Sequence, residues 1–347
     1  MSTPRQDGFR WPAEWEPHLG TWIAWPHSRG TWFERLQAIP PIWIEMIRAL
    51  QEGEKIFLLV NDSKMEEQAR QLLIQASVPL QNIRFYPIPT IDAWLRDTGP
   101  IFLVKEENGK KRLAMVDWIF NAWGKKYMEW EGDNILPEKM AEQLELPIYR
   151  PGIVLEGGSI EGNGHGTLLT TEQCLLNPNR NPTLSKEEIE NYLKEYLGVR
   201  HILWLKEGII GDDTDGHVDD IARFVNPSTV VCAIEERRKD ENYGPLQENY
   251  ERLQRMTDAD GNRLQVITLP MPDPVEYEGV RLPASYANFY IGNRVVLVPT
   301  FDHPNDGKAL NTLQKLFPER RVVGISCKDV VIGLGAFHCI TQQHPLT

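Results

Sequence analysis

The sequence predicts an α/β fold made of repeated ββαβ-like units in one domain. Short apolar runs rich in Val, Ile, Leu and aromatic residues, bounded by Gly, Pro, Asn or Asp, alternate with amphipathic patterns along all 347 residues. More than one strand-like run accompanies each amphipathic pattern, which exceeds what a simple βα alternation gives. No stretch has the composition of a linker, so we expect one domain over residues 1–347.

The amphipathic patterns predict helices, and local signals mark several of their ends. Pro41 suits a first helical turn, where its missing N–H has no helical partner to lose. Ser185 and Glu188 have the spacing of a capping box, and Gly198 after Leu197 is a stop signal. The predicted helices span residues 41–51, 63–76, 137–146, 186–197, 244–256 and 306–317.

The apolar runs between these helices predict strands, because they are short, rich in β-branched and aromatic residues and bounded by turn formers. The predicted strands span residues 21–25, 55–60, 83–88, 113–118, 201–205, 229–234, 264–269, 294–299 and 321–326. The repeat is visible in the order of these elements and not in residue identity.

Charge and cysteine content exclude several classes of protein. Acidic residues outnumber basic ones by 49 to 37, giving a net charge of −12 without any long basic block. This balance argues against nucleic acid or an anionic membrane as a partner and favours a small cationic substrate. Four cysteines without a CxxC pair argue against a disulfide framework and a thiolate zinc site.

The N-terminal residues and the apolar runs predict a cytoplasmic protein. The chain opens with MSTPRQDGFRWPAEWEPHLG, which lacks the basic and apolar regions of a secretory signal. The longest apolar runs, such as residues 56–60 and 295–298, fall far short of the ~20 residues that a membrane span needs.

Polar side chains that could carry chemistry gather in four segments beside glycines or strand ends, where catalytic groups are often found. The four segments are residues 91–100, 155–159, 211–220 and 333–343. The third of them holds His217 and five aspartates, and a cation would relieve the mutual repulsion of the aspartates.

Three interpretations of the acidic segment 211–220 stay open: a solvated loop, a carboxylate–histidine metal site, or a site for an organic cation. An EF-hand is excluded, because aligning Gly216 with the loop glycine puts Ala222 where the last carboxylate ligand belongs. His217 and Asp219 lie two residues apart, so an extended segment would point both side chains the same way. One could then transfer protons while the other holds a cation.

Cys339 is the candidate nucleophile, because Gly333, Gly335 and His338 surround it with a context unlike a core position. The other cysteines, at 174, 232 and 327, are expected to be small buried hydrophobes. A papain-like protease fits poorly, since the signature around its cysteine is missing and His217 precedes Cys339 by 122 residues.

A thiol, a histidine and several carboxylates together suit attack on a guanidinium carbon. The guanidinium arrives as a cation, and two carboxylates can hold it through bidentate hydrogen bonds. The bound cation then favours a thiolate, while a histidine protonates the departing ammonia and later activates water. This chemistry needs no metal and no organic cofactor.

Eight segments, in order and over nearly the whole chain, resemble the agmatine deiminases of the guanidine-modifying (pentein) superfamily. The resemblance implies a five-bladed α/β propeller with pseudo-fivefold symmetry and a central active site. It also implies deimination of agmatine to N-carbamoylputrescine and ammonia, in putrescine and polyamine metabolism. The segments are PAEWEPHLGTWIAWPHS, WLRDTGP, DWIFNAWGKKY, LEGGS, GTLLTTEQCLLNPNRNP, GDDTDGHVDDIARFV, LPASYANFYI and HCITQQHP.

The resemblance also implies roles for individual residues. Cys339 would form a covalent amidino-thioether, and His217 would act as general acid and base. Asp97 and Asp219 would grip the guanidinium. Six further residues would complete the site. Glu156 would orient His217 and help line the site, Trp94 would wall the pocket, and Asp213 would meet the terminal amine. Asp212 and Asp215 would be structural, and His338 would shape the loop that carries Cys339.

The chain departs from the family pattern at two places. Leu334 and Ala336 interrupt a usually more Gly-rich run before the nucleophile and would add bulk beside the substrate. Glu161-Gly162-Asn163 replaces a usual His/Asp pair. Substrate choice is therefore open between agmatine and free or C-terminal peptidyl arginine, and the acidic residues 212–215 favour an amine over a carboxylate.

Three other functions also stay open at this point: amidino transfer to an amine, a metal hydrolase built on the segment 211–220, and a non-catalytic binding protein. The presence of the full set of catalytic residue types makes the last the weakest. The oligomeric state is not fixed by the sequence, although related enzymes are often dimers and a homodimer is thus one expectation.

Overall fold

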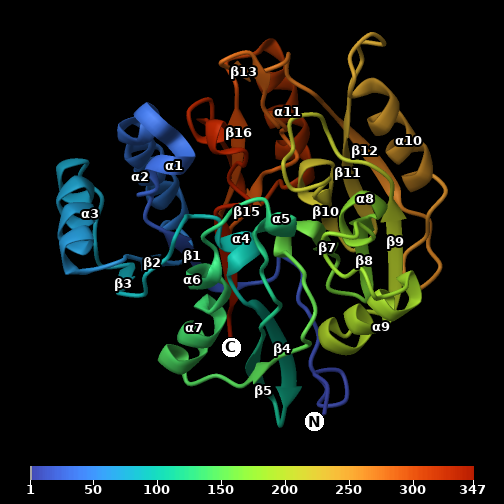
Figure 1. Cartoon of the computed structure of the whole chain (residues 1–347), viewed down its shortest axis with the longest axis horizontal. Helices are drawn as coiled ribbons and strands as arrows, with labels where there is room; N and C mark the ends of the chain where they lie inside the picture. The colour runs from blue at the N-terminus through green and yellow to red at the C-terminus, as the bar shows by residue number, and fades with distance from the viewer. Residues whose placement is uncertain (1) are drawn as a thin grey trace.

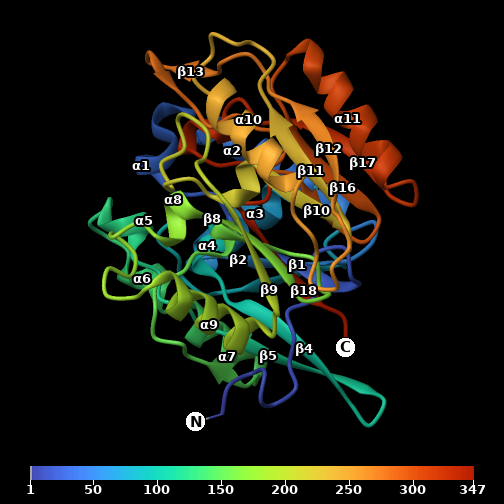
Figure 2. The same cartoon turned by 90° about the vertical axis from the view of Figure 1, so that its right-hand side faces the viewer.

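Five small sheets of one design make up the fold of the computed structural model, which describes residues 2–347. In each sheet, an antiparallel pair of strands is followed by a parallel pair, with helical segments in the connection to the parallel strand. Figures 1 and 2 show the helices α3, α7, α9, α10 and α11 on the outside of the sheets. The predicted ββαβ-like unit is therefore present.

The strands are grouped by sheet as follows: β18 (Thr341–Pro345), β1 (His18–Ala24), β2 (Lys55–Leu59) and β3 (Ile83–Tyr86); β4 (Ile101–Glu107), β5 (Lys110–Val116) and β6 (Ile148–Tyr149); β7 (Ile160–Gly162), β8 (Thr167–Thr171) and β9 (His201–Leu205); β10 (Ala222–Asn226), β11 (Thr229–Ile234) and β12 (Gln265–Pro270); β15 (Tyr290–Ile291), β16 (Val295–Thr300) and β17 (Arg321–Ser326). A separate hairpin pairs β13 (Glu276–Tyr277) with β14 (Val280–Arg281).

The α-helices are α1 (Arg29–Trp32), α2 (Ile39–Leu50), α3 (Ser63–Gln75), α4 (Leu95–Thr98), α5 (Ala122–Lys125), α6 (Glu131–Asn134), α7 (Leu136–Leu144), α8 (Glu172–Leu175), α9 (Lys186–Leu197), α10 (Tyr243–Leu253) and α11 (Pro304–Leu316). Short 3₁₀ turns are η1 (Phe33–Ala38), η2 (Gly157–Ser159), η3 (Val218–Asp220) and η4 (Val330–Gly333). All six predicted helices are confirmed, with ends displaced by at most three residues.

Local signals explain the best-defined helix, α9. Ser185 Oγ accepts a hydrogen bond from the N–H of Glu188, and the Glu188 carboxylate accepts one from the N–H of Ser185. This is the predicted capping box, which satisfies two N–H groups that a helix start leaves without partners. Gly198 ends the helix in the left-handed region, with φ of +69°.

The nine predicted strands are confirmed. The prediction missed β6, β8 and the hairpin β13–β14, and it also missed the strand that opens each sheet: β4, β7, β10, β15 and β18. Strand β18 reads TQQHP and is buried over its whole length, so its polar composition hid it from a search for apolar runs. Strands β7 and β15 have only three and two residues. These short strands carry no periodicity that a sequence pattern could reveal.

Each of these opening strands begins a few residues after a residue of the candidate site. Asp97 precedes β4, Gly158 precedes β7, Asp219 precedes β10, Asn288 precedes β15, and Cys339 precedes β18. Strand β18 at the C-terminus pairs antiparallel with β1 near the N-terminus, so the first sheet joins both ends of the chain. The repeat thus brings one short loop from each sheet into a common region. No helix among residues 2–347 is long and apolar enough to cross a membrane.

A buried network of charges ties these loops together around Glu14. Its carboxylate accepts hydrogen bonds from Arg223 Nη2 at 2.9 Å, Arg96 Nη2 at 3.2 Å and the N–H of Ile291 at 2.8 Å. His338 Nε2 lies 2.9 Å from the same carboxylate. These partners come from β10, α4, β15 and the loop before β18. The Coulomb attraction of Arg223, His338 and Arg96 outweighs burial and holds the pKa of Glu14 well below its usual value.

Replacing Glu14 by Gln is expected to lower the free energy of unfolding by about 3–5 kcal/mol, because it leaves two buried guanidinium groups short of negative charge. Glu52→Gln is the matched control, since its pair with Arg321 is about half-exposed on both sides and should contribute less than ~1 kcal/mol. Urea unfolding of both variants measures the difference. Equal losses in the two variants would contradict the importance of the buried network.

Candidate active site

A cavity of about 470 Å³ opens where the loops before the strands converge. Trp94, Asp97, Asp213 and Cys339, four of the predicted site residues, line it. Its size is that of a typical small-molecule site. Glu156, His217 and Asp219, the other three predicted residues, are buried behind this lining.

Cys339 lines this cavity and is 7% exposed as a residue. The side-chain amide of Asn288 donates a hydrogen bond to Sγ at 3.1 Å, and Asp219 Oδ2 lies 3.7 Å from Sγ. Burial, together with the negative charges of Asp219, Asp220 and Asp97, raises the pKa of the Cys339 thiol well above its usual value. Ionisation of this thiol therefore calls for a nearby cation.

Close packing beside Cys339 explains why residue 335 is a glycine. A Cβ on Gly335 would lie 2.5 Å from the Trp94 ring and 3.1 Å from Cys339 Cβ, so only glycine allows this close approach. Leu334 adopts φ of +71°, a left-handed conformation that costs a leucine energy, and its side chain lines the cavity. The expectation for Ala336 was wrong: this residue is fully buried and does not border the cavity among the described residues.

Asp97 is fixed by two donors. Its Oδ1 accepts a hydrogen bond from the N–H of Gly158, and its Oδ2 accepts one from Trp123 Nε1, both at 2.9 Å. Burial and the neighbouring charge of Asp219 nevertheless raise the pKa of Asp97 well above its ordinary value. When two carboxylates are crowded together, the ionised one disfavours ionisation of the other, so Asp97 is the member of this pair that a bound cation would help to ionise.

His217 is buried, and neither of its ring nitrogens has a hydrogen-bond partner among residues 2–347. Nδ1 lies 3.7 Å from Asp97 Oδ1. Burial lowers the pKa of His217 to about 3, so the ring is neutral. The expected extended segment around His217 is wrong, because residues 218–220 form the 3₁₀ turn η3.

His217 and Asp219 nonetheless converge on one point, the α-carbon of Gly158. A Cβ there would lie 2.6 Å from His217 Nδ1, 2.8 Å from Asp97 Oδ1 and 3.2 Å from Asp219 Oδ2. Gly158, in the LEGGS segment, is thus required so that the three groups can come together.

Asp219 is held by His338, which connects it to the buried network. His338 Nδ1 lies 2.6 Å from Asp219 Oδ2, while its Nε2 faces Glu14. Although burial opposes ionisation, the hydrogen bond and charge of His338 lower the pKa of Asp219. His338 therefore connects a carboxylate at the thiol to the interior of the fold, in keeping with the structural role predicted for it.

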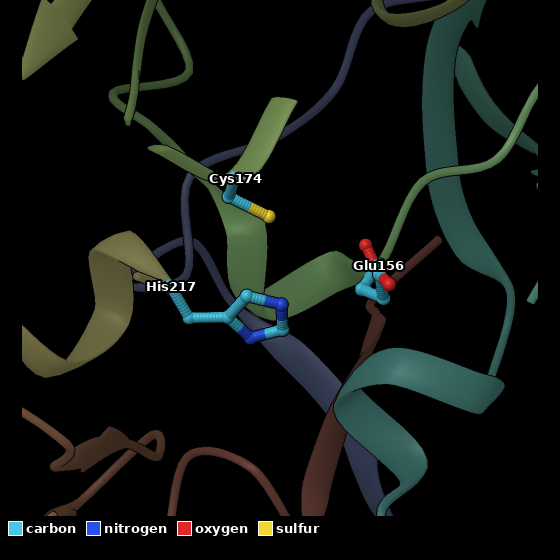
Figure 3. A group of neighbouring side chains, drawn as sticks. All are labelled: Glu156, Cys174 and His217. Atoms are coloured by element: carbon cyan, nitrogen blue, oxygen red, sulfur yellow. The ribbon is translucent and has the colours of Figure 1, made fainter. Parts of the chain in front are cut away.

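Glu156 has a partner that the sequence did not reveal. Arg180 Nε donates to Glu156 Oε1 at 2.7 Å, whereas Oε2 has no partner within the described chain. No hydrogen bond joins Glu156 to His217 among residues 2–347, so the predicted orienting role stays a prediction. Figure 3 shows Glu156 and Cys174 on the same side of the His217 ring.

Two protein cations offset part of the negative charge of the acidic segment 211–220. Arg180 Nη1 lies 2.6 Å and Lys126 Nζ 2.9 Å from the Asp215 carboxylate. Asp212 accepts hydrogen bonds from the backbone N–H groups of Thr214, Gly216 and His217, which makes it structural, as expected. The solvated-loop and metal-loop interpretations both overlooked these partners.

Asp213 lines the cavity, as expected of a residue that meets a substrate amine. Its carboxylate accepts a hydrogen bond from the Tyr127 hydroxyl at 2.8 Å and lies 3.4 Å from Lys126 Nζ. Lys126 would therefore share Asp213 with any bound amine.

Trp123 is held by an uncommon backbone conformation. Ala122, Trp123, Gly124 and Lys125 all have positive φ angles, between 50° and 91°, so α5 is a left-handed turn. Each non-glycine residue in this conformation costs roughly 1–2 kcal/mol. The turn carries the indole to Asp97 and to the cavity wall. Strain of this kind commonly marks functional sites.

Four residues of the site had no predicted role: Glu14, Trp123, Arg180 and Asn288. All four lie within the eight segments that resemble the family. Asn288 fits the structural repeat, since each of the other four sheets has a site residue just before its first strand.

Comparison with known proteins identifies the relatives of this chain. Residues 10–345 match the family described as Porphyromonas-type peptidyl-arginine deiminase. A Legionella pneumophila relative that is provisionally named an agmatine deiminase is 41% identical over 346 residues, covering 99% of this chain and 97% of its own.

Two solved structures are similar throughout. The agmatine deiminase of Enterococcus faecalis, captured catalysing its reaction, is 37% identical with a TM-score of 0.92, covering 99% of this chain and 98% of its own. The agmatine deiminase of C. jejuni, a Cys-to-Ser variant with substrate bound, is 33% identical with a TM-score of 0.88, covering 97% and 96%. The α/β fold is thus confirmed.

Iodoacetamide is expected to alkylate Cys339 alone in the native protein, because its thiol borders the cavity whereas Cys174, Cys232 and Cys327 are 0% exposed. Peptide mass spectrometry should find one carboxamidomethyl group per chain, and none in a Cys339→Ala variant. Early labelling of any other cysteine would contradict this picture of the site.

Proposed function

The chain belongs to the Porphyromonas-type peptidyl-arginine deiminase family, and on that basis we propose that it hydrolyses agmatine to N-carbamoylputrescine and ammonia. The observation that carries the choice of substrate is the charge of the cavity. Five carboxyl side chains line it, and among the described residues no Lys or Arg does; the five are Asp92, Asp97, Glu129, Asp133 and Asp213. Such a lining suits a substrate that is cationic at both ends.

Free or C-terminal peptidyl arginine is the weaker candidate. Its carboxylate would enter a lining without a basic side chain within the described residues, and would lose its water of hydration without gaining an ion pair. Leu334, in place of a glycine in the family pattern, also narrows the cavity beside Cys339. We propose Asp213 as the partner of the substrate amine.

The proposed first step is attack of Cys339 Sγ on the guanidinium carbon. Asp97 and Asp219 would hold the guanidinium, whose charge offsets the negative groups that otherwise keep the thiol protonated. The thiol proton would pass through His217 to the departing nitrogen, which leaves as ammonia. A C–S bond forms, a C–N bond breaks, and an amidino-thioether remains on Cys339.

The proposed second step is hydrolysis. His217, neutral and without a partner for either ring nitrogen among residues 2–347, would accept a proton from a water molecule that attacks the same carbon. The C–S bond then breaks, the sulfur regains its proton, and the ureido product leaves. Trp94 would wall the pocket, and Glu156 would keep the surroundings of His217 polar. These steps use no cofactor.

We make further proposals about the architecture, location and assembly of the protein. We propose that the five sheets form a five-bladed propeller around the site, because each contributes one loop to the same region. Residues 1–347 would then form one catalytic domain. We also propose a cytoplasmic location, a role in putrescine synthesis and a homodimer.

The experiment that tests the proposed function measures ureido product from agmatine, arginine and a C-terminal arginine peptide side by side. Agmatine should give strong turnover, iodoacetamide should block it, and EDTA should leave it unchanged. Cys339→Ala should lower kcat by roughly 10⁴-fold or more without loss of the fold. Preference for arginine or the peptide would contradict agmatine as the substrate but keep the mechanism. Activity lost only with EDTA would overturn the thiol mechanism.

Trp123→Phe is expected to lower kcat/KM for agmatine by roughly 10- to 100-fold, because Asp97 loses one of its two donors. Trp130→Phe is the matched control, since Trp130 lines the same cavity but donates no hydrogen bond to Asp97 within the described chain. Steady-state kinetics with circular dichroism as a check on folding would measure both. Equal effects of the two substitutions would show that ring packing alone matters.

A further inference from the structure

Behind the cavity lies a group of three side chains of metal-ligating types: Glu156, Cys174 and His217. One ligand atom from each lies within 4.8 Å of the other two, and all three residues are buried. Figure 3 shows the thiol, the carboxylate and one ring nitrogen directed toward a common space. They come from α8, from the loop before η2 and from the loop before η3.

Three polar atoms in this group make no hydrogen bond within the described chain. Glu156 Oε2 and both nitrogens of His217 are buried without a hydrogen-bond partner among residues 2–347. Buried polar atoms normally find partners, because leaving one unsatisfied costs about 1–3 kcal/mol. His217 Nδ1 faces Asp97, which leaves its other nitrogen for the space shared with Cys174.

We propose that Glu156, Cys174 and His217 bind a single Zn²⁺ ion, and that this ion inhibits the enzyme by occupying His217. Nitrogen, sulfur and oxygen are together the ligand set that Zn²⁺ accepts, and three protein ligands leave a fourth position for water. Binding releases the thiol proton of Cys174 to solvent, and no bond to carbon is made or broken. A histidine whose ring nitrogen is bound to the metal cannot shuttle protons.

Two charges set the strength of this site. Arg180 already holds Glu156 Oε1 at 2.7 Å, so one cation lies next to the metal position and limits its affinity. A bound guanidinium would lie against Asp97, whose Oδ1 is 3.7 Å from His217 Nδ1, and would add a second cation near the metal position. Zn²⁺ and agmatine are therefore expected to exclude one another, which predicts competitive inhibition. This kinetic consequence depends on the proposed function, whereas metal binding itself does not.

Metal binding is tested first with Co²⁺ alone and the full-length Cys339→Ala variant, which lacks the nucleophilic thiol. A cobalt–thiolate charge-transfer absorption is expected, and it should disappear when Cys174→Ala is added but persist when Cys232→Ala is added instead. Cys232 is the matched control because it is equally buried on β11, outside the group of three. Absence of the absorption in Cys339→Ala, or its persistence without Cys174, would overturn the proposal.

Inhibition is then measured with Zn²⁺ alone at several agmatine concentrations. The inhibition constant is expected to rise by about 10- to 100-fold in Cys174→Ala and to stay unchanged in Cys232→Ala. Equal inhibition of wild type and Cys174→Ala would place the metal elsewhere, for instance on Cys339, and would overturn the proposal. If no variant turns over agmatine, the proposed function fails while the cobalt result still decides the metal site.

Discussion

The carboxylate of Glu14 is the interaction on which the arrangement of the site depends. Taking a carboxylate out of water costs several kcal/mol, and that cost is recovered only if every partner is in place. Its partners belong to α4, β10, β15 and the loop before β18. Four segments that are distant in sequence are thereby fixed to one point. The network specifies how the sheets meet, which apolar packing alone would leave less sharply defined.

The same network reaches the reacting groups through His338. Asp219 stays ionised because His338 lies 2.6 Å away, while Asp97 and Asp220 crowd it and have raised pKa values. The thiol of Cys339 is also disfavoured as an anion. The free site thus holds more acidic groups than it can ionise. A cation that entered would stabilise carboxylates and thiolate together, so binding and activation of the nucleophile become one event.

Much of the fold and of the site could be predicted from the sequence, and the features that could not be predicted have identifiable physical reasons. Amphipathic helices such as α9 carry periodicity and caps within a dozen residues, and these signals are local. Strand β18 and Asn288 are specified by long-range pairing, which a single sequence does not display. The cations that neutralise the acidic loop, Lys126 and Arg180, lie 35 or more residues away from Asp215. Residue types indicated the chemistry, but not which partners compensate each charge.

Arg180 connects catalysis with the group of three buried ligands. A neutral histidine without hydrogen-bond partners is needed for proton transfer, yet such a nitrogen beside a thiol and a carboxylate is also what a soft divalent ion binds. Removing the carboxylate would protect the histidine but would leave Arg180 unpaired in the interior. Retaining Arg180 instead places a fixed cation next to Glu156, which weakens metal binding without occupying His217. The ion pair between Arg180 and Glu156 therefore leaves no unpaired charge in the interior and disfavours tight binding of a metal.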